Sequence, residues 1–270
     1  MIQKIRWKWQ LRVFLYRIGL WSLLSTLRLI YSYQSKCPHE AEFRFLANFQ
    51  GQEGLLIDVG ANAGQSVVSC RMFNSSYSII SFEPNPLHRY DLKRTKMLFG
   101  FNKFEYHLVG LGDEIGSLQL FFPVVQGVPL SQEATLSREG LLEDETTRRR
   151  IFASTGQSEF SIKETKIALE KLDDYELTPD FVKIDVQLSE LKVLQGMRKT
   201  LQNSHPILII ENGPYLHAII EHFWSFGYRP YQYNQEKNRL EPSGVDAICM
   251  NVFFVARTRL AWLGSLICEG

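Results

Sequence analysis

The stretch Leu55-Leu56-Ile57-Asp58-Val59-Gly60-Ala61-Asn62-Ala63-Gly64 decides the fold. Its first five residues are a short, nearly continuous apolar run, which is typical of a strand buried on both faces. The two glycines then allow a tight turn and a close approach of the backbone to a ligand. A helical pattern follows over 65–73. The N-terminus of such a helix offers free N–H groups to an anion, so the stretch predicts a strand, a ligand-binding turn and a helix.

The same alternation of strand-like and helix-like segments continues along the chain. Further strands are predicted over 78–82, 104–109, 181–184, 206–210, 228–233 and 251–257, and further helices over 87–98, 189–201 and 216–226. Apolar strands separated by helices indicate a parallel sheet that is covered on both faces and binds ligands at the carboxyl ends of its strands. We therefore predict an α/β fold, with a doubly wound, mostly parallel seven-stranded sheet of the Rossmann-like type and an N-terminal helical extension.

Composition and charge exclude several classes of protein. The chain has 270 residues, 45% of them apolar and 22% charged, with a net charge of +1. This near-neutral charge argues against a nucleic-acid partner, which needs a basic surface. The four cysteines form no C-x-x-C pair, so neither a zinc knuckle nor a disulfide framework is indicated. We expect a reduced, cytoplasmic protein.

The first 33 residues differ from the rest of the chain. They contain six bases and no acid, whereas the remaining residues contain 24 bases and 29 acids. Their longest charge-free stretch, Ile18 to Leu27, has ten residues, and a membrane span needs about 20. Trp, Tyr and Arg in this pattern favour an interfacial helix with peripheral membrane contact. An arm that docks on the body or on a partner explains the pattern equally well.

The chain divides into three parts. We expect a basic, apolar helical extension over 1–35, a main domain over 36–258 and a C-terminal tail over 259–270. Within the main domain, residues 113–175 interrupt the alternation of strands and helices, with a strand-like run at 117–122 and a charged helical stretch around 139–150. We interpret 113–175 as an insertion that forms a lid or a cover on the substrate side.

Glu83 indicates which kind of ligand the turn binds. It ends the second predicted strand, 25 residues after Asp58, where an acid can accept hydrogen bonds from both hydroxyls of a ribose. A dinucleotide fold would instead show G-x-G-x-x-G to admit a pyrophosphate. Here Asn62 stands where the second glycine should be, and Asp58 would repel a pyrophosphate. The pattern therefore favours S-adenosylmethionine, which carries a cationic sulfonium and no phosphate.

Six segments in this order resemble the FkbM-type family of class I S-adenosylmethionine-dependent methyltransferases. They are IDVGANAGQS (57–66), SFEPNP (81–86), VGLGDEIG (109–116), VKIDVQLSELKVLQGM (182–197), ILIIENG (207–213) and NVFFV (251–255). The resemblance implies the class I fold and O-methylation of a hydroxyl on a sugar, glycolipid or natural-product acceptor. It also implies cofactor roles: Asp58, Gly60, Asn62 and Gly64 around the methionine part, Glu83 on the ribose and Asp113 near the adenine.

One position departs from the family pattern. Leu188 stands where the family usually has glycine, within Asp185-Val186-Gln187-Leu188-Ser189-Glu190. If this position requires a positive φ, a leucine there is strained, and its side chain would narrow the substrate pocket. This departure supports an alternative function, a non-catalytic binding or scaffolding module that keeps the fold. A nicotinamide-dependent oxidoreductase is a third hypothesis, against which the missing second glycine argues.

The catalytic candidates are carboxylates near the expected methyl group. A sugar hydroxyl is a poor nucleophile, so a base beside it would help. Asp185, at the carboxyl end of the fourth predicted strand, is the first candidate, and Glu190 and Glu211 would shape the acceptor site. By analogy with some class I O-methyltransferases, Asp185, Glu211 and Asn212 could hold Mg²⁺, but our assignment contains no metal ligand. His88 and His107 are also left out of the catalytic set.

Overall fold

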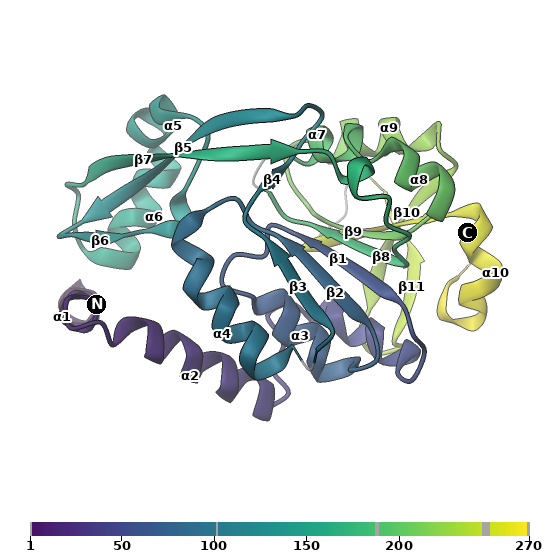
Figure 1. The fold of residues 1–270 in the computed structure, drawn as a ribbon, viewed down its shortest axis with the longest axis horizontal. Helices are drawn as coiled ribbons and strands as arrows, with labels where there is room; N and C mark the ends of the chain where they lie inside the picture. Colours follow the sequence, from purple (N-terminus) through teal and green to yellow (C-terminus); the bar gives the residue numbers. More distant parts are fainter. Residues whose placement is uncertain (1, 101, 187–188, 245–248, 269–270) are drawn as a thin grey trace.

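The strand β1 (Leu55–Val59) lies near the centre of the larger of two β-sheets. The computed structural model describes residues 2–100, 102–186, 189–244 and 249–268 and shows an α/β fold with two sheets (Figure 1). The main sheet has the strand order β11-β10-β12-β9-β8-β1-β2-β3. Its other strands are β2 (Ser78–Phe82), β3 (Phe104–His107), β8 (Phe181–Ile184), β9 (Ile207–Glu211), β10 (Tyr228–Asn234), β11 (Arg239–Pro242) and β12 (Asn251–Ala256).

Helices cover both faces of this sheet. Because successive side chains of a strand point to opposite faces, neighbouring residues are buried on opposite sides. Leu56 packs with the helices on one side of the sheet, and Ile57 with those on the other. The first side is covered by η1 (Ala41–Phe49), α3 (Gln65–Phe73) and α4 (Arg89–Phe99), and the second by α7 (Glu190–Gln195), α8 (Arg198–Ser204) and α9 (Leu216–Trp224). This double burial explains why the strands are nearly continuous apolar runs.

The α/β class is confirmed, but the predicted seven-stranded, mostly parallel sheet is corrected to a mixed sheet of eight strands. The five strands from β9 to β3 are parallel to one another, whereas β12, β10 and β11 join by antiparallel pairings. The additional strand is β11, which returns from β10 as a hairpin. Its sequence Arg-Leu-Glu-Pro shows too short an alternation to predict a strand, and its proline suits the edge position that it occupies.

The predicted helix over 189–201 is interrupted at Gly196, between α7 and α8. A Cβ on Gly196 would lie 1.8 Å from the carbonyl oxygen of Gly112. The backbone therefore approaches the neighbouring loop more closely than any residue with a side chain permits. The break is set by a tertiary contact, which the local pattern of apolar residues does not contain.

The region between β3 and β8 forms the second sheet. This sheet has the order β4-β7-β5-β6 and consists of β4 (Gly110–Leu111), β5 (Gly116–Val125), β6 (Val128–Pro129) and β7 (Ser161–Glu170), accompanied by η3 (Ser131–Glu133), α5 (Arg138–Glu143) and α6 (Glu145–Thr155). The strand β7 was not predicted from the sequence pattern. Its exposed side chains include the charged Lys163, Glu164 and Lys166, and it is held by its long antiparallel pairing with β5.

The N-terminal residues form two helices, α1 (Ile2–Arg17) and α2 (Trp21–Gln34), which lie along one side of the molecule (Figure 1). Trp9 and Val13 of α1 are buried against Val125, Val128 and Ile151. On α2, the side chains of Leu29, Ile30 and Tyr33 pack against α3 and α4. Among the described residues, no single helix is long and apolar enough to span a membrane; α1 and α2 meet that test only jointly, as a pair bent by 113°.

Three short connections and a short C-terminal helix complete the architecture. The connections are η2 (Pro86–His88), η4 (Leu172–Tyr175) and η5 (Arg257–Arg259), and η5 is followed by α10 (Leu260–Leu263) and η6 (Gly264–Leu266). Trp262 of α10 stacks on Phe49 with ring centroids 4.7 Å apart. The C-terminal segment therefore packs on the same side of the main sheet as η1.

Candidate active site

The turn after β1 needs its glycines. Gly60 has a φ of +91°, and a Cβ on it would lie 1.9 Å from the backbone oxygen of Asp185. Gly64, the N-cap of α3, also has a φ of +91°, and a Cβ there would lie 2.8 Å from the Thr95 side chain. Asn62 adopts the left-handed region as well, with a φ of +50°. The first glycine thus brings the loops after β1 and β8 into direct contact.

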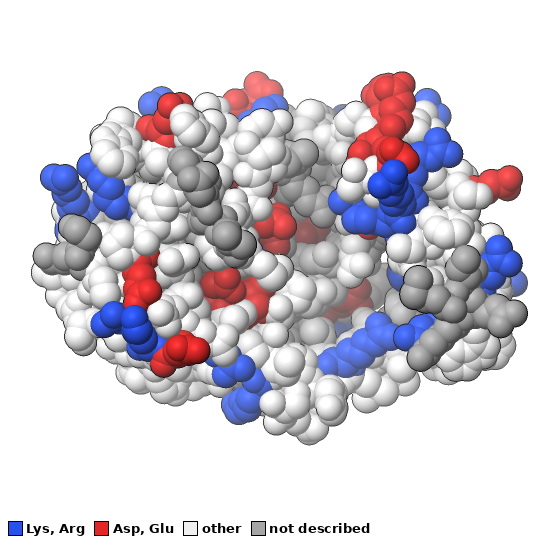
Figure 2. Space-filling view, turned by 180° about the vertical axis from the view of Figure 1, so that it is seen from behind, with Lys and Arg blue, Asp and Glu red and all other residues white. Residues whose placement is uncertain are grey.

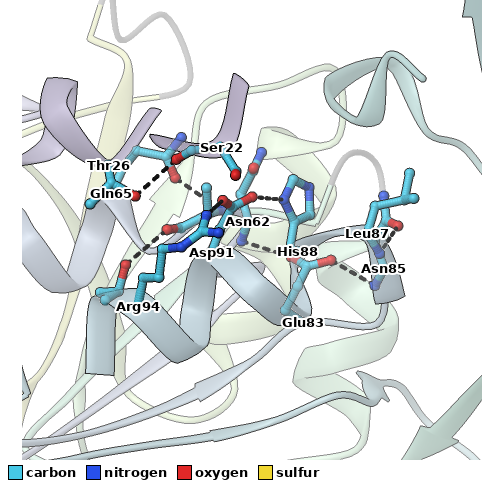
Figure 3. Close-up of polar contacts among 12 residues, drawn as sticks. Ser22, Thr26, Asn62, Gln65, Glu83, Asn85, Leu87, His88, Asp91 and Arg94 are labelled. Atoms are coloured by element: carbon cyan, nitrogen blue, oxygen red, sulfur yellow. Dashed lines mark hydrogen bonds and ion pairs between the residues drawn. The ribbon is translucent and has the colours of Figure 1, made fainter. Parts of the chain in front are cut away.

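Glu83 is fixed between two turns (Figure 3). It follows β2 and is buried. Its Oε2 accepts a hydrogen bond of 2.7 Å from the backbone N–H of Asn62, and its Oε1 accepts one of 2.8 Å from that of Asn85. Burial raises the pKa of Glu83, while the charge of His88 and the two amide hydrogen bonds oppose the rise. Each carboxylate oxygen keeps a second acceptor position for a ligand hydroxyl.

A cavity of about 350 Å³ opens at the carboxyl ends of β1, β2, β8 and β9, which is a size typical of small-molecule sites. Gly60, Asn62, Glu83, Asp185 and Glu211 line it on the side of the main sheet. The opposite wall comes from the second sheet and η3, and includes Leu120, Ser131, Thr135, Leu136, Ile167 and Leu169. On the face opposite to that of Figure 1, acidic side chains gather around a hollow (Figure 2).

The six predicted cofactor residues do not all reach this cavity. Gly60, Asn62 and Glu83 line it, whereas Asp58, Gly64 and Asp113 are not among its described lining residues. Asp58 is fully buried at the end of β1, where Ser81 Oγ donates a hydrogen bond of 3.0 Å to its Oδ2. Asp113 lies half-buried in the turn between β4 and β5. The roles predicted for these residues stay predictions.

Burial also changes the acidity of Asp58. It raises the pKa of this carboxyl to about 6, and the charge of Lys183 and the hydrogen bond from Ser81 limit the rise. The buried environment of Asp58, next to the Gly60 turn, therefore disfavours the ionised form of its carboxyl. Asp58 thus lies buried behind the residues that line the cavity.

Two of the predicted catalytic residues meet in the cavity wall. A side-chain hydrogen bond joins Glu211 to Asp185, and the pKa of Glu211 is raised to about 7 by partial desolvation of its carboxyl, by the charge of Asp185 and by this hydrogen bond. Glu190 is buried at the start of α7 and is not among the described lining residues. Its charge contributes to the raised pKa of Glu211. Glu190 therefore lies close enough to influence Glu211 by its charge but is not a described lining residue of the cavity.

Lys183 is a site residue that the sequence analysis missed. Its side chain is 1% exposed, and its Nζ lies 3.0 Å from Asp185 Oδ2 and 3.3 Å from Glu40 Oε1. Burial lowers the pKa of Lys183, but the charges of Asp185, Glu40 and Asp58 outweigh this effect and raise it above its usual value. The lysine inside the apolar strand Phe-Val-Lys-Ile could have predicted a buried charge cluster, because a buried ammonium needs a carboxylate partner.

The proposed Mg²⁺ ligands do not fit a metal site. Among the described residues, no three His, Cys, Asp or Glu side chains are arranged to hold a metal ion. The ammonium of Lys183 lies against Asp185, and Asn212 Nδ2 donates a hydrogen bond of 3.0 Å to the carbonyl oxygen of Cys249. We therefore assign no metal to Asp185, Glu211 and Asn212. The departure at Leu188 falls outside the described residues.

The two histidines left out of the catalytic set differ in position. His88 lines the cavity, and its Nδ1 is buried without a hydrogen-bond partner among the described residues, 3.8 Å from Asp91 Oδ2 (Figure 3). Its neighbour Asn85 likewise has a buried Nδ2 without a partner. His107 stacks on Phe82 with ring centroids 5.1 Å apart. His88 and Asn85 both line the cavity, while these two nitrogen atoms are enclosed by protein.

The sequence matches one known protein family. The family model described as the methyltransferase FkbM domain matches residues 58–230. No curated protein matches the sequence significantly. The similar solved structures include a methyltransferase FkbM from Methylobacillus flagellatus KT, with 15% identity, a TM-score of 0.47 and coverage of 87% of this chain. The chain covers 53% of that protein, about half of its length.

Two further solved structures illustrate the range of similar proteins. A precorrin-6y C5,15-methyltransferase from Geobacter metallireducens GS-15 has 13% identity, a TM-score of 0.38 and coverage of 78% of this chain and 82% of its own. An rRNA methylase from Streptococcus thermophilus has 12% identity, a TM-score of 0.41 and coverage of 79% of this chain and 90% of its own.

Proposed function

This chain belongs to the FkbM methyltransferase family, and we propose that it transfers a methyl group from S-adenosylmethionine to a hydroxyl of a sugar, glycolipid or natural-product acceptor. One observation carries the choice of cofactor. Three acids, Glu83, Asp185 and Glu211, line the cavity, and its described lining residues include no Lys or Arg. Such a cavity favours a ligand with cationic sulfonium and ammonium groups and disfavours the pyrophosphate of a dinucleotide.

The residues at the turn fit this cofactor. Glu83 is held rigidly by two amide hydrogen bonds and is positioned to accept from ribose hydroxyls. Gly60 leaves its side of the cavity free of a side chain. Asn85 and His88, which also line the cavity, each contain a buried nitrogen atom without a hydrogen-bond partner among the described residues. When bound, S-adenosylmethionine supplies an electrophilic methyl group on an excellent leaving group.

The Asp185–Glu211 pair supplies the acid–base chemistry. A general base works best when its pKa lies near the working pH, and the pKa of Glu211 is about 7. The pair accepts the proton of the acceptor hydroxyl as the new C–O bond forms and the methyl–sulfur bond breaks, which leaves S-adenosylhomocysteine as the second product. Lys183 holds Asp185 through its contact of 3.0 Å and so acts as a positioning residue. The second sheet, which lines the opposite wall, contacts the acceptor.

Methyl transfer is tested with S-adenosylmethionine that carries a labelled methyl group and with panels of monosaccharides, glycolipids and hydroxylated polyketides. Glu211→Gln and Asp185→Asn should lower turnover at saturating S-adenosylmethionine by about 10²–10⁴-fold, the range for loss of a general base. Glu105→Gln, at an exposed position of β3, is the control. Unchanged turnover in both cavity variants contradicts the proposed base. Cofactor binding without transfer to any acceptor contradicts the enzymatic role and favours the binding module.

A further inference from the structure

The helices α1 and α2 present an apolar surface that the rest of the chain does not cover. Nine of the twenty exposed large apolar side chains among the described residues lie on these helices or on the turn between them. We call this the N-terminal face: it consists of Trp7, Leu11, Phe14, Tyr16, Ile18, Leu20, Leu23, Leu27 and Tyr31. Trp7 is 65% exposed and Tyr31 is 73% exposed. So many exposed apolar side chains on two neighbouring helices are typical of an interaction site.

The helices are nevertheless firmly attached to the body by their other side. Trp9 is 1% exposed, and its Nε1 donates a hydrogen bond of 3.0 Å to Gln126 Oε1. The guanidinium of Arg12 lies over the rings of Trp9 and Trp21, at 5.2 Å and 4.6 Å from their centroids. These contacts hold the bend between α1 and α2. The N-terminal face is therefore a fixed surface of the folded protein and not an unpacked arm.

Charge identifies the partner. The first 33 residues contain six bases and no acid, and the described basic side chains of α1 and α2, which are Arg6, Lys8, Arg12, Arg17 and Arg28, form no ion pair with other described residues. Two such faces would repel each other, which disfavours a symmetric dimer through them. Indole and phenol rings beside unpaired cations suit the headgroup region of a bilayer, where cations meet anionic lipids.

We propose that the N-terminal face binds the surface of a membrane that contains anionic lipids. The exposed apolar side chains enter the boundary between headgroups and acyl chains, and the bases pair with lipid phosphates and carboxylates. In this arrangement the pair α1–α2, which is bent by 113°, lies in the plane of the interface. This inference does not depend on the proposed methyl transfer.

The test is vesicle flotation of the full-length chain. The protein should float with vesicles in which phosphatidylglycerol replaces part of the phosphatidylcholine, and much less with vesicles of phosphatidylcholine alone. Added KCl should release it, because screening weakens the attraction between the bases and the lipids. A protein that stays unbound with both kinds of vesicle overturns the proposal.

Two sets of substitutions locate the binding surface. Trp7→Ser with Phe14→Ser and Leu23→Ser, and separately Lys8→Glu with Arg17→Glu, should each lower the partition coefficient at least tenfold. All five residues are exposed, so the thermal midpoint should be preserved, which is checked for each variant. Binding that is unchanged in both sets overturns the proposal.

Matched controls carry the same changes elsewhere on the surface. Ile115→Ser with Leu142→Ser and Met250→Ser removes three apolar side chains that are 71%, 48% and 69% exposed, and Lys163→Glu with Lys166→Glu reverses two exposed charges on β7. These controls should bind like the unmodified chain. If the chain is a dimer in solution, and Trp7→Ser, Phe14→Ser and Leu23→Ser together convert it to a monomer, the membrane-binding proposal is contradicted. The partner of the N-terminal face is then a second copy of the chain.

Discussion

Replacing Lys183 by Met tests the charge network beneath the candidate site. Met preserves most of the side-chain volume but removes the ammonium that lies 3.0 Å from Asp185 and 3.3 Å from Glu40. Removing one partner of a buried ion pair costs about 3–5 kcal/mol, because the other charge stays buried without compensation. For a protein of this size we expect the thermal midpoint to fall by about 6–20 °C, at about 2–4 °C per kcal/mol.

The pH dependence separates this electrostatic cost from a packing defect. Without Lys183 the pKa of Asp58, already about 6, should rise further, because Lys183 lowers it. A carboxyl whose pKa is raised by folding stabilises the protein at low pH, and that contribution is lost as the pH rises through its folded pKa. The stability lost in Lys183→Met should therefore be smaller below about pH 6 than at alkaline pH, where the remaining carboxylates are all ionised.

The assay is denaturant unfolding across this pH range, with Lys166→Met as the control. Lys166 is an exposed strand lysine, and its replacement should change the free energy of unfolding by less than about 0.5 kcal/mol. Adding Glu40→Gln to Lys183→Met should recover part of the loss, because one unpaired carboxylate is removed. A loss under about 1 kcal/mol, well below the usual cost of breaking a buried pair, or a loss that grows towards acid pH, would refute the reasoning.

Three further predictions concern the turn, the carboxyl pair and α1. Gly60→Ala should abolish cofactor binding in calorimetry, whereas Gly127→Ala, with a similar φ of +84° but nothing within 4 Å of its Cβ, should leave binding intact; equal effects would contradict the steric argument. In the native state Glu211 has a pKa of about 7, against a usual value of 4.5. The unmodified protein should therefore lose stability relative to Glu211→Gln as the pH rises between these two values. If the two proteins show parallel curves of unfolding free energy against pH, the raised pKa is contradicted. Trp9→Ala empties a buried position at a cost of about 3–5 kcal/mol, so limited trypsin digestion should cut α1 faster than in the unmodified chain; equal cleavage rates would show that Trp9 does not anchor the helix.

The sequence predicted the parallel centre of the main sheet well, because those strands are buried on both faces. The boundaries of β1, α3, β2 and β8 match the predicted ranges, since apolar runs and the glycine turn delimit them. The prediction was poorest where tertiary contacts decide. The strand β7 exposes charged side chains, β11 is a short edge strand, and the break at Gly196 depends on a loop that is distant in the sequence.

The candidate site shows the same division. Glu83, Asp185 and Glu211 could be predicted to lie near one another, because they follow or end the parallel strands β2, β8 and β9, whose carboxyl ends meet at one edge of the sheet. Glu40 could not, since it reaches Lys183 from a segment before η1, 143 positions away in the chain, and nothing in its local sequence marks it. The wall formed by the second sheet was also unpredictable in detail, because it rests on the long pairing of β5 with β7.

The central claim is that this cavity binds S-adenosylmethionine through Glu83. Its most direct test is isothermal titration calorimetry of the full-length chain with S-adenosylhomocysteine and with NAD, for the unmodified protein, Glu83→Ala and the exposed-site control Glu105→Gln. The account predicts micromolar binding of S-adenosylhomocysteine, a loss of at least tenfold in Glu83→Ala alone, and no binding of NAD. Absence of S-adenosylhomocysteine binding, or equal affinity in a correctly folded Glu83→Ala variant, would contradict it.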